Sequence, residues 1–242
     1  MYEYTLYFKA VAPSLAIKDC LHRPEDGLGF SYKIYCREGI LHVDAFFCCE
    51  DRNYARKAQV VCEDFCKKII DVLFFEFEIR ISDFEFCGGD FSGDNTVGVV
   101  VPTINISIDR DMCRAVYVGD SCLFGGADRP LFAAYSAMYR AALDSSDEIT
   151  KFMLLYNILC SLVKGESQGG VDRLIASVCP GVEVLISPHG CNKRETVFTR
   201  LRNEISHHRS GSIFRTERYD VYKVVSVFKK IVKRVIQEYC NA

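Results

Sequence analysis

Apolar and polar side chains alternate along much of the first half of the chain, the pattern of strands with one buried face. Residues 2–10 alternate in this way. Residues 30–36 and 40–47 repeat the pattern around Arg37, Glu38 and Gly39, which predicts a hairpin with glycine in its turn. Two further strands are predicted at residues 75–81 and 97–108, where Pro102 indicates an edge or a bulge. The glycine-bearing segment 87–95 is predicted to be a loop.

One helix is predicted among these strands. Between residues 58 and 73, apolar side chains recur three and four positions apart, which is the spacing of a helix with one buried face. Residues 1–120 are therefore expected to form a mostly antiparallel β-sheet domain with one main helix.

After residue 119 the apolar period changes to that of helices. Pro130 suits the first turn of a helix over residues 131–143, and Asp147 is the expected N-cap of a helix over residues 149–164. Further helices are predicted at residues 171–178, 194–209 and 219–239. We expect residues 128–242 to form an all-α bundle, so the predicted fold class is α+β with two domains.

The net charge of −2 over 242 residues hides an uneven distribution. Residues 191–242 carry 12 Lys and Arg against five Asp and Glu, a balance of +7, which leaves −9 for residues 1–190. A cationic last fifth of the chain can attract a polyanion such as RNA by its field alone. The alternative interpretation is that these charges are the solvated faces of two surface helices.

Thirteen cysteines suggest disulfides or metal binding, and the sequence favours neither. The first nine residues lack a secretory signal pattern, so we expect a reducing, cytoplasmic setting. Several cysteines lie in apolar runs, where a thiol serves as a small hydrophobe: Cys62, Cys66, Cys113 and Cys160. The cysteine and histidine spacings form no four-ligand set, so no metal or cofactor is expected. No apolar stretch approaches the roughly 20 residues of a membrane span.

The candidate chemistry lies in the predicted helix over residues 194–209. At about 100° per residue, its apolar side chains share one face: Val197, Phe198, Leu201 and Ile205. The opposite face collects hydrogen-bonding side chains with one titratable imidazole: Glu195, Thr199, Arg202, Asn203, Ser206 and His207. A merely solvated face would more often hold lysine and glutamate, so this face favours a functional interpretation.

Arg202 and His207 fit the R-x4-6-H motif, and Asn203 completes its common form Arg-Asn-x3-His. On these residues the chain resembles the HEPN domain superfamily, over roughly residues 130–240. The apolar helix with a tyrosine at residues 151–163 is similar to one in ApeA-like and MauJ-like HEPN proteins. Arg202 with His208, and Arg200 with His207, also satisfy the loose motif. On the helical wheel His208 falls toward the apolar side, and Arg200 lies further than His207 from the position of Arg202. Arg202 and His207 are therefore preferred.

The resemblance implies a metal-independent endoribonuclease in which the RNA 2′-OH attacks the neighbouring phosphate. His207 would be the general acid or base, and Arg202 would hold the phosphate. Supporting roles are implied for Asn203, Ser206, Thr199 and Glu195, and a homodimer is implied because HEPN nucleases pair two motifs across a cleft. RNA contacts are expected from cationic residues of the last fifth of the chain: Arg200, Arg209, Lys230 and Arg234. A toxin or antiphage role is implied, with a sensing or regulatory function for residues 1–120, which would take a regulatory protein or ligand.

Two alternatives stay open at this point. In the first, a non-catalytic HEPN-fold module binds RNA or protein, and Arg202 and His207 make structural bonds. In the second, a different enzyme has its site in the N-terminal domain, where acids lie in or near predicted loops: Asp90, Asp94, Asp109 and Asp111. Acids with this spacing are commonly turn formers, so the second alternative is the weaker one.

Overall fold

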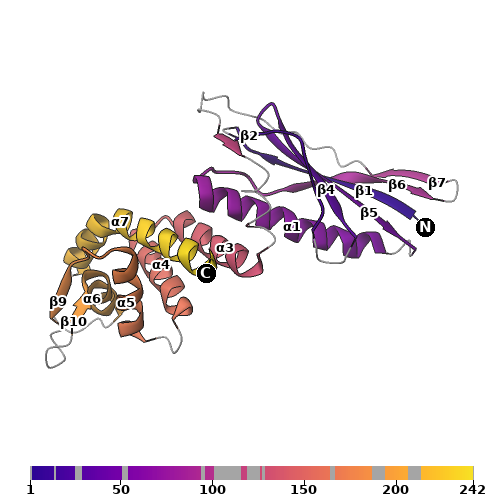
Figure 1. The fold of residues 1–242 in the computed structure, drawn as a ribbon. Coiled ribbons are helices and arrows are strands. Elements are labelled where there is room, and N and C mark those ends of the chain that lie inside the picture. Colours follow the sequence, from indigo (N-terminus) through magenta and orange to yellow (C-terminus); the bar gives the residue numbers. More distant parts are fainter. Residues whose placement is uncertain are drawn as a thin grey trace. The chain divides into compact units, whose positions relative to one another are not determined.

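A computed structural model describes residues 2–13, 15–24, 29–50, 54–93, 96–100, 116–118, 126, 129–163, 167–186, 194–206 and 214–241. The chain divides into two compact units, Met1–Ala133 and Ala134–Ala242. The first holds an antiparallel sheet and a long helix, and the second is mainly helical, so the fold is mixed α+β (Figure 1).

The main sheet of the first unit has six strands in the order β3-β4-β5-β1-β6-β7. Strand β1 (Tyr2–Val11) lies at its centre and pairs antiparallel with β5 (Ile40–Cys49) and β6 (Glu85–Gly93). The outer strands are β3 (Cys20–His22), β4 (Ser31–Arg37) and β7 (Thr96–Val100). A separate parallel pair joins β2 (Leu15–Ile17) to β8 (Val116–Val118).

The predicted hairpin is confirmed. Strands β4 and β5 pair from Ser31 with Phe46 to Arg37 with Ile40, which leaves Glu38 and Gly39 as a two-residue turn. Both turn residues have positive φ, 52° at Glu38 and 75° at Gly39. This is the conformation whose twist matches that of paired strands, and it favours glycine.

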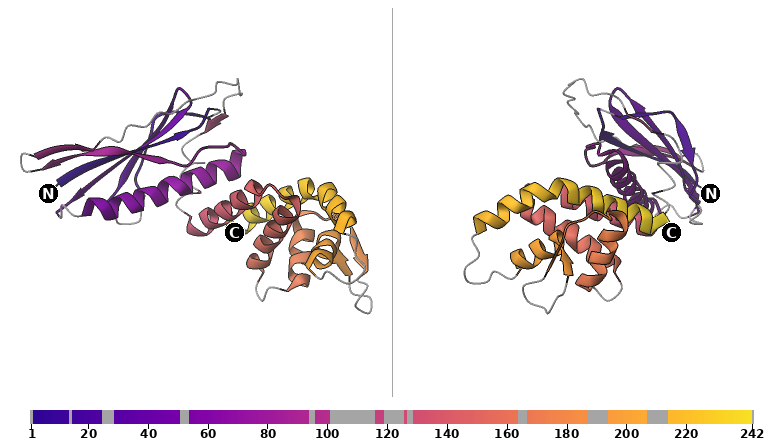
Figure 2. Two further views of the ribbon diagram at one scale, coloured as in Figure 1. Left: turned by 180° about the vertical axis from the view of Figure 1, so that it is seen from behind. Right: turned by 60° about the vertical axis from the view of Figure 1, so that its left-hand side comes forward.

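The core of the first unit lies between one sheet face and helix α1 (Tyr54–Phe77), which runs along that face (Figure 2). Tyr4, Leu6, Phe8 and Ala10 are buried, whereas the alternate residues of β1 are partly exposed, as the alternation predicts. The helix contributes a matching stripe that includes Phe65, whose ring stacks on Tyr32 at 3.9 Å.

Two cysteines of this helix behave as the apolar small residues that the sequence predicts. Cys62 and Cys66 are fully buried in the core. Burial raises the pKa of the Cys62 thiol to about 12 and that of Cys66 well above its ordinary value. Both thiols therefore stay protonated at neutral pH, where they pack as hydrophobic groups.

The prediction of a strand at residues 75–81 is wrong. Helix α1 continues through Phe77 because Phe74 and Phe75 extend its buried stripe. It ends where Glu78 takes a positive φ of 55° and its N–H donates to the Phe74 carbonyl oxygen at 2.8 Å. Ile79 and Ile81 are buried beyond that point, so an alternation of buried residues arises here without strand pairing.

The loop predicted at residues 87–95 is also wrong, because residues 85–93 form β6. A Cβ at Gly89 would lie 2.7 Å from the Thr5 carbonyl oxygen and 2.8 Å from Leu6 Cδ2, so only glycine allows this close pairing. The register also shifts between Tyr7 and Phe8, which marks a bulge. The glycines thus permit a strand beside β1. The predicted strand 97–108 is described only through β7, and Pro102 lies outside the described residues.

The second unit is mainly helical. Helix α3 (Pro130–Asp144) begins just before it, and the helices that follow are α4 (Glu148–Leu162), α5 (Gln168–Val178), α6 (Val197–Ser206) and α7 (Phe214–Asn241). Pro130 is in the first turn of α3, and the Asp147 side chain accepts from the Thr150 N–H at 2.8 Å, so both predicted helix starts are confirmed. Among the described helices, none combines the length and apolar character needed to cross a lipid bilayer.

The core of the second unit is an aromatic cluster centred on Phe228 of α7. Its ring lies 4.9 Å from that of Phe152 on α4 and 4.6 Å from that of Phe198 on α6. Tyr156, one turn after Phe152, also packs here, at 6.3 Å from Phe228. These contacts join α4, α6 and α7 and fix which side of α6 faces inward.

Candidate functional site

The helix predicted over residues 194–209 is shorter than expected. Residues 194–196 form strand β10, which pairs antiparallel with β9 (Val184–Ile186), and α6 begins only at Val197. Thr196 is the reason for this start: its Oγ1 accepts from the Thr199 N–H at 3.2 Å, the bond of an N-cap threonine. Glu195 is therefore placed by a strand, and not by the helical wheel.

Asp172 of α5 joins this helix start to the rest of the unit. Its Oδ1 accepts from the Thr196 N–H at 3.0 Å, the Thr196 hydroxyl at 2.7 Å and the Thr199 hydroxyl at 2.6 Å. Since Thr199 donates its one hydroxyl proton to Asp172, Tyr156 is the donor in the 2.9 Å contact between the Tyr156 and Thr199 hydroxyls. The polar chain Tyr156, Thr199, Asp172 and Thr196, here called the brace, thus links α4, α5 and α6.

Three residues of the brace are buried, and Asp172 is half-buried. Tyr156 is fully buried, and this desolvation raises its pKa to about 12, although the bond to Thr199 and nearby Arg202 act in the opposite direction. Thr199, which the helical wheel placed on the polar face, is 1% exposed. Its hydroxyl faces other helices, so its role is in the brace.

Arg202 lies one turn beyond Thr199 and is half-buried. Its Nη1 donates to Asn203 Oδ1 at 3.2 Å, and its Cζ lies 5.8 Å from the centre of the Tyr156 ring. Its Nε is buried and has no hydrogen-bond partner among the described residues. Within the described part of the chain, no carboxylate is in ion-pair contact with Arg202. Among the described residues, the guanidinium is therefore held by neutral groups and has no acid partner.

Asn203 is the centre of the hydrogen bonds around Arg202. Its Oδ1 accepts from Gln168 Nε2 at 2.7 Å as well as from Arg202. Its Nδ2 donates to Gln168 Oε1 at 3.4 Å and to Glu195 Oε2 at 3.5 Å. Residues from α5, β10 and α6 thus meet at one amide.

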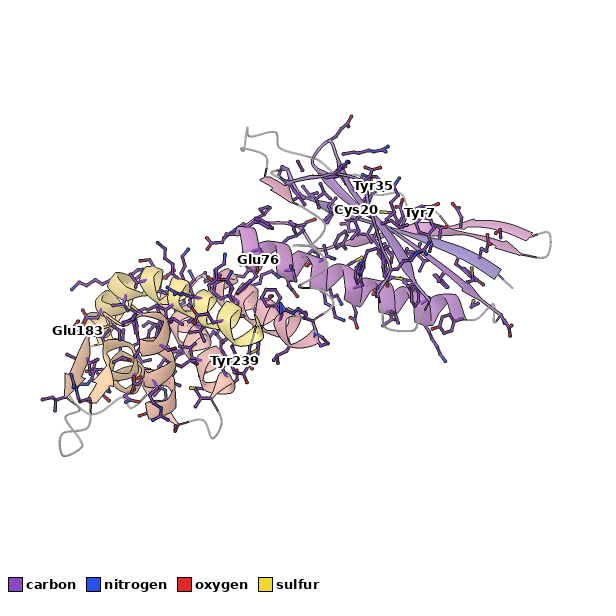
Figure 3. All side chains as sticks on the ribbon, in the orientation of Figure 1. Tyr7, Cys20, Tyr35, Glu76, Glu183 and Tyr239 are labelled. Carbon is purple, nitrogen blue, oxygen red and sulfur yellow. The ribbon has the colours of Figure 1, made fainter. Side chains whose placement is uncertain are left out.

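Glu195 and Arg200 form an ion pair that ties α6 to the β9-β10 hairpin. Arg200 Nε donates to Glu195 Oε1, and its Nη2 donates to the Ile186 carbonyl oxygen. Glu195 is 4% exposed, so its carboxylate is buried with a cation beside it. The hairpin is also joined to the helix by the Val197 N–H, which donates to the carbonyl oxygen of Glu183, labelled in Figure 3. Arg200, predicted to contact RNA, is engaged in this structural contact.

The remaining predicted site residues lie at the end of α6, beyond it and on α7. Ser206 is exposed at the last position of α6. His207, His208 and Arg209 lie outside the described residues. Lys230 and Arg234 lie on the exposed side of α7, about 200° and 240° around the helix from Phe228, which faces α6. Arg234 pairs with Glu238 at 2.9 Å.

The N-terminal acids of the alternative site are described only in part. Asp90 lies on β6, where it accepts from the Tyr7 hydroxyl at 2.6 Å, and Asp94, Asp109 and Asp111 are outside the described residues. No three His, Cys, Asp or Glu side chains in the described ranges are placed to hold a metal ion.

Three contributors to the site were missed from the sequence: Gln168, Asp172 and Thr196. Gln168 was missed because this helix was predicted to begin only at residue 171, whereas α5 begins at Gln168 behind the N-cap Ser167, whose Oγ accepts from the Gly170 N–H at 3.2 Å. Serine before a helical stretch was the available signal. Asp172 gave no local signal, because its partners are more than 20 residues away.

These polar contacts on α4, α5, β10 and α6 are thus the site that the described structure offers. In comparisons with protein-family models, curated proteins and solved structures, the chain has no match.

Proposed function

We propose that the chain is a metal-independent endoribonuclease of the HEPN type, with its second unit a HEPN-like bundle. Support comes from the spacing of Arg202 and His207 and from the position of Arg202 on a late helix of a helical unit. The biological role that we propose is RNA cleavage as a toxin or in antiphage defence. RNA is the partner, and the first unit is a sensing or regulatory part.

The observation that carries this proposal is that Arg202 has no acid partner among the residues that the structure describes. A half-buried cation without an acid partner is costly to maintain, because desolvation is offset only by neutral groups. Arg202 is held by the Asn203 amide and lies near the Tyr156 ring, while the nearby carboxylate of Glu195 is paired with Arg200. A phosphate would supply the missing counter-charge and accept charge-assisted hydrogen bonds from the guanidinium.

The reaction that follows is transfer within the RNA backbone. The ribose 2′-oxygen forms a bond to the adjacent phosphorus, the bond to the 5′-oxygen of the next nucleotide breaks, and a 2′,3′-cyclic phosphate remains. Arg202 stabilises the negative charge that grows on the phosphate oxygens. His207 transfers a proton, since histidine titrates near neutral pH whereas Tyr156, with a pKa of about 12, stays protonated.

The reaction needs two proton transfers, one from the 2′-OH and one to the departing 5′-oxygen. One imidazole for both steps would have to act in sequence on the two sides of the phosphorus. We infer that two chains supply two imidazoles to a shared cleft, so the active form is a homodimer. Sedimentation equilibrium should give twice the mass of one chain, and a monomer that still cleaves would contradict this part.

The test is RNA cleavage by the purified full-length chain in EDTA. We expect cyclic-phosphate products from the wild type, and their loss in both Arg202→Ala and His207→Ala. Arg173→Ala is the matched control, because Arg173 is an exposed arginine of the neighbouring helix α5. RNA that stays intact with the wild type, but binds it in an Arg202-dependent way, would favour a non-catalytic binding module. Cleavage that both variants retain would overturn the site.

A further inference from the structure

The amides of Gln168 and Asn203 face each other as a reciprocal pair. Gln168 Nε2 donates to Asn203 Oδ1 at 2.7 Å, and Asn203 Nδ2 donates back to Gln168 Oε1 at 3.4 Å. Gln168 belongs to α5 and Asn203 to α6, helices that lie side by side (Figure 1). This pair therefore fixes the orientation of the Asn203 side chain from a separate helix.

Only one orientation of the Asn203 amide satisfies its neighbours. Its oxygen accepts from Gln168 and from Arg202, and its two N–H groups face Gln168 Oε1 and the Glu195 carboxylate. A flipped amide would place its NH2 group against the Arg202 Nη1 donor and its oxygen against the carboxylate, which are both repulsive pairings. The Asn203 oxygen must consequently face the guanidinium.

Gln168 is itself firmly placed at the first position of α5. The Ser167 side chain caps this helix, and the Gly170 N–H donates to it. A Cβ at Gly170 would lie 2.2 Å from Val163 Cγ1, so the first turn of α5 packs directly on the end of α4. A glutamine on an anchored turn can hold a partner in place, because little of its surroundings moves.

We propose that Gln168 is a positioning residue for Arg202, which acts through Asn203 to aim the guanidinium at the RNA phosphate. The inference rests on the proposed ribonuclease function. Nη1 is held by Asn203, so the remaining donors on the outer edge of the guanidinium form the fork that meets the phosphate oxygens. Without Gln168, the Asn203 amide can rotate and the fork loses its fixed direction.

We expect Gln168→Ala to lower kcat for RNA cleavage about 10- to 100-fold, the range for a misplaced group near the reacting atoms. The KM should change less, because Arg202 keeps its charge. The kcat of Gln168→Met should fall as far, since methionine fills the same space without hydrogen bonds. If Gln168 only packed, Gln168→Met would behave like the wild type, and that result would overturn the proposal.

A double-mutant cycle tests the route through Arg202. Gln168→Ala should cost nothing further in an Arg202→Lys background, which keeps measurable cleavage, because its effect requires the planar guanidinium. Gln59→Ala is the matched control: Gln59 also lies on a helix and loses one side-chain bond, to Glu63 at 2.8 Å. Its cleavage rate should equal that of the wild type. Independent, multiplying effects of Gln168→Ala and Arg202→Lys would contradict the proposal.

A spectroscopic readout separates failure of this inference from failure of the proposed function. In ¹H–¹⁵N NMR spectra, the Arg202 Nε–H and Asn203 NH2 signals should shift in Gln168→Met, with unchanged unfolding midpoints. Unmoved signals would refute the positioning role even if the chain cleaves RNA. Shifted signals in a chain that does not cleave RNA would support the hydrogen-bond route from Gln168 to Arg202 and refute the proposed ribonuclease function.

Discussion

Each unit contains a polar cluster, and the two differ in how their arginines are paired. On the outer face of the sheet, Tyr35 stacks on His42 at 4.6 Å, and Lys33 and Arg37 lie 5.1 and 5.0 Å from the Tyr35 ring. Both cations also reach Asp19, at 3.3 and 3.9 Å. Figure 3 labels Tyr35 and Tyr7 on this sheet. The cations of this outer-face cluster therefore have their counter-charge within the unit, whereas Arg202 has none among the described residues.

This difference shows why residue type alone does not locate a site. Both clusters contain arginine, tyrosine and carboxylate, so composition makes them equal candidates. The partner of each charge separates them, because a neutralised cation gains little from a phosphate and an uncompensated one gains much. Substitutions in both units test this contrast, and their expected effects range from about 3 kcal/mol to under about 1 kcal/mol.

The largest effect is expected at Asp172, the centre of the brace. Asp172→Ala removes the acceptor of three donors, all on the buried threonines Thr196 and Thr199, and should lower the free energy of unfolding by about 3 kcal/mol. Asp90→Ala in the first unit removes one bond, from Tyr7, and should cost about 1 kcal/mol. Urea denaturation followed by far-UV circular dichroism measures both. Equal costs would show that the brace does not hold α6.

The second effect concerns the shape of the Arg202 side chain. Arg202→Lys keeps the charge but loses the planar fork and the bond geometry to Asn203, so RNA cleavage should fall about 10- to 100-fold. Arg37→Lys in the outer-face cluster is the matched control and should leave cleavage within about twofold. Initial rates on a labelled RNA measure both. If the lysine variant at position 202 cleaves as well as the wild type, charge alone suffices there and the oriented fork is unnecessary.

The third effect is a dependence of stability on pH at the buried tyrosine. The pKa of Tyr156 in the folded chain is about 12 against an ordinary value of 10.0. As the pH rises, the unfolded chain therefore loses the hydroxyl proton of Tyr156 before the folded chain does. The contribution of Tyr156 is complete below pH 10 and is lost as the pH rises toward 12. Tyr156→Phe should therefore lose less stability than the wild type between these pH values, as measured by urea denaturation. Identical slopes would mean that Tyr156 ionises freely in the folded state.

The features that the sequence predicted correctly are local ones. The strand over residues 2–10 and the Asp147 cap depend on neighbours within a few positions, and both are confirmed. The strand at 75–81 was wrong because alternation at Ile79 and Ile81 reflects burial without pairing. At the site, Arg202 and Asn203 were found from their spacing. Gln168 and Asp172 were not, since their bonds span 35 and 24 residues and depend on how α5 packs beside α6.

The smallest effect is expected where the sheet cluster neutralises its own charges. Asp19→Asn removes the ion-pair partner of Lys33 and Arg37, whose side chains are 40% and 67% exposed. Exposed pairs of this kind contribute about 0 to 1 kcal/mol, less at high salt, so unfolding should change by under about 1 kcal/mol. RNA affinity, measured by fluorescence anisotropy, is the sharper readout. This substitution removes the acid that pairs with both cations and leaves Asp44 as a nearby carboxylate. A large gain in RNA affinity would show that the Asp19 ion pairs kept the outer-face cluster from binding phosphate. An unchanged affinity would show that release of these ion pairs is insufficient, and that the fixed geometry around Arg202 is a second requirement.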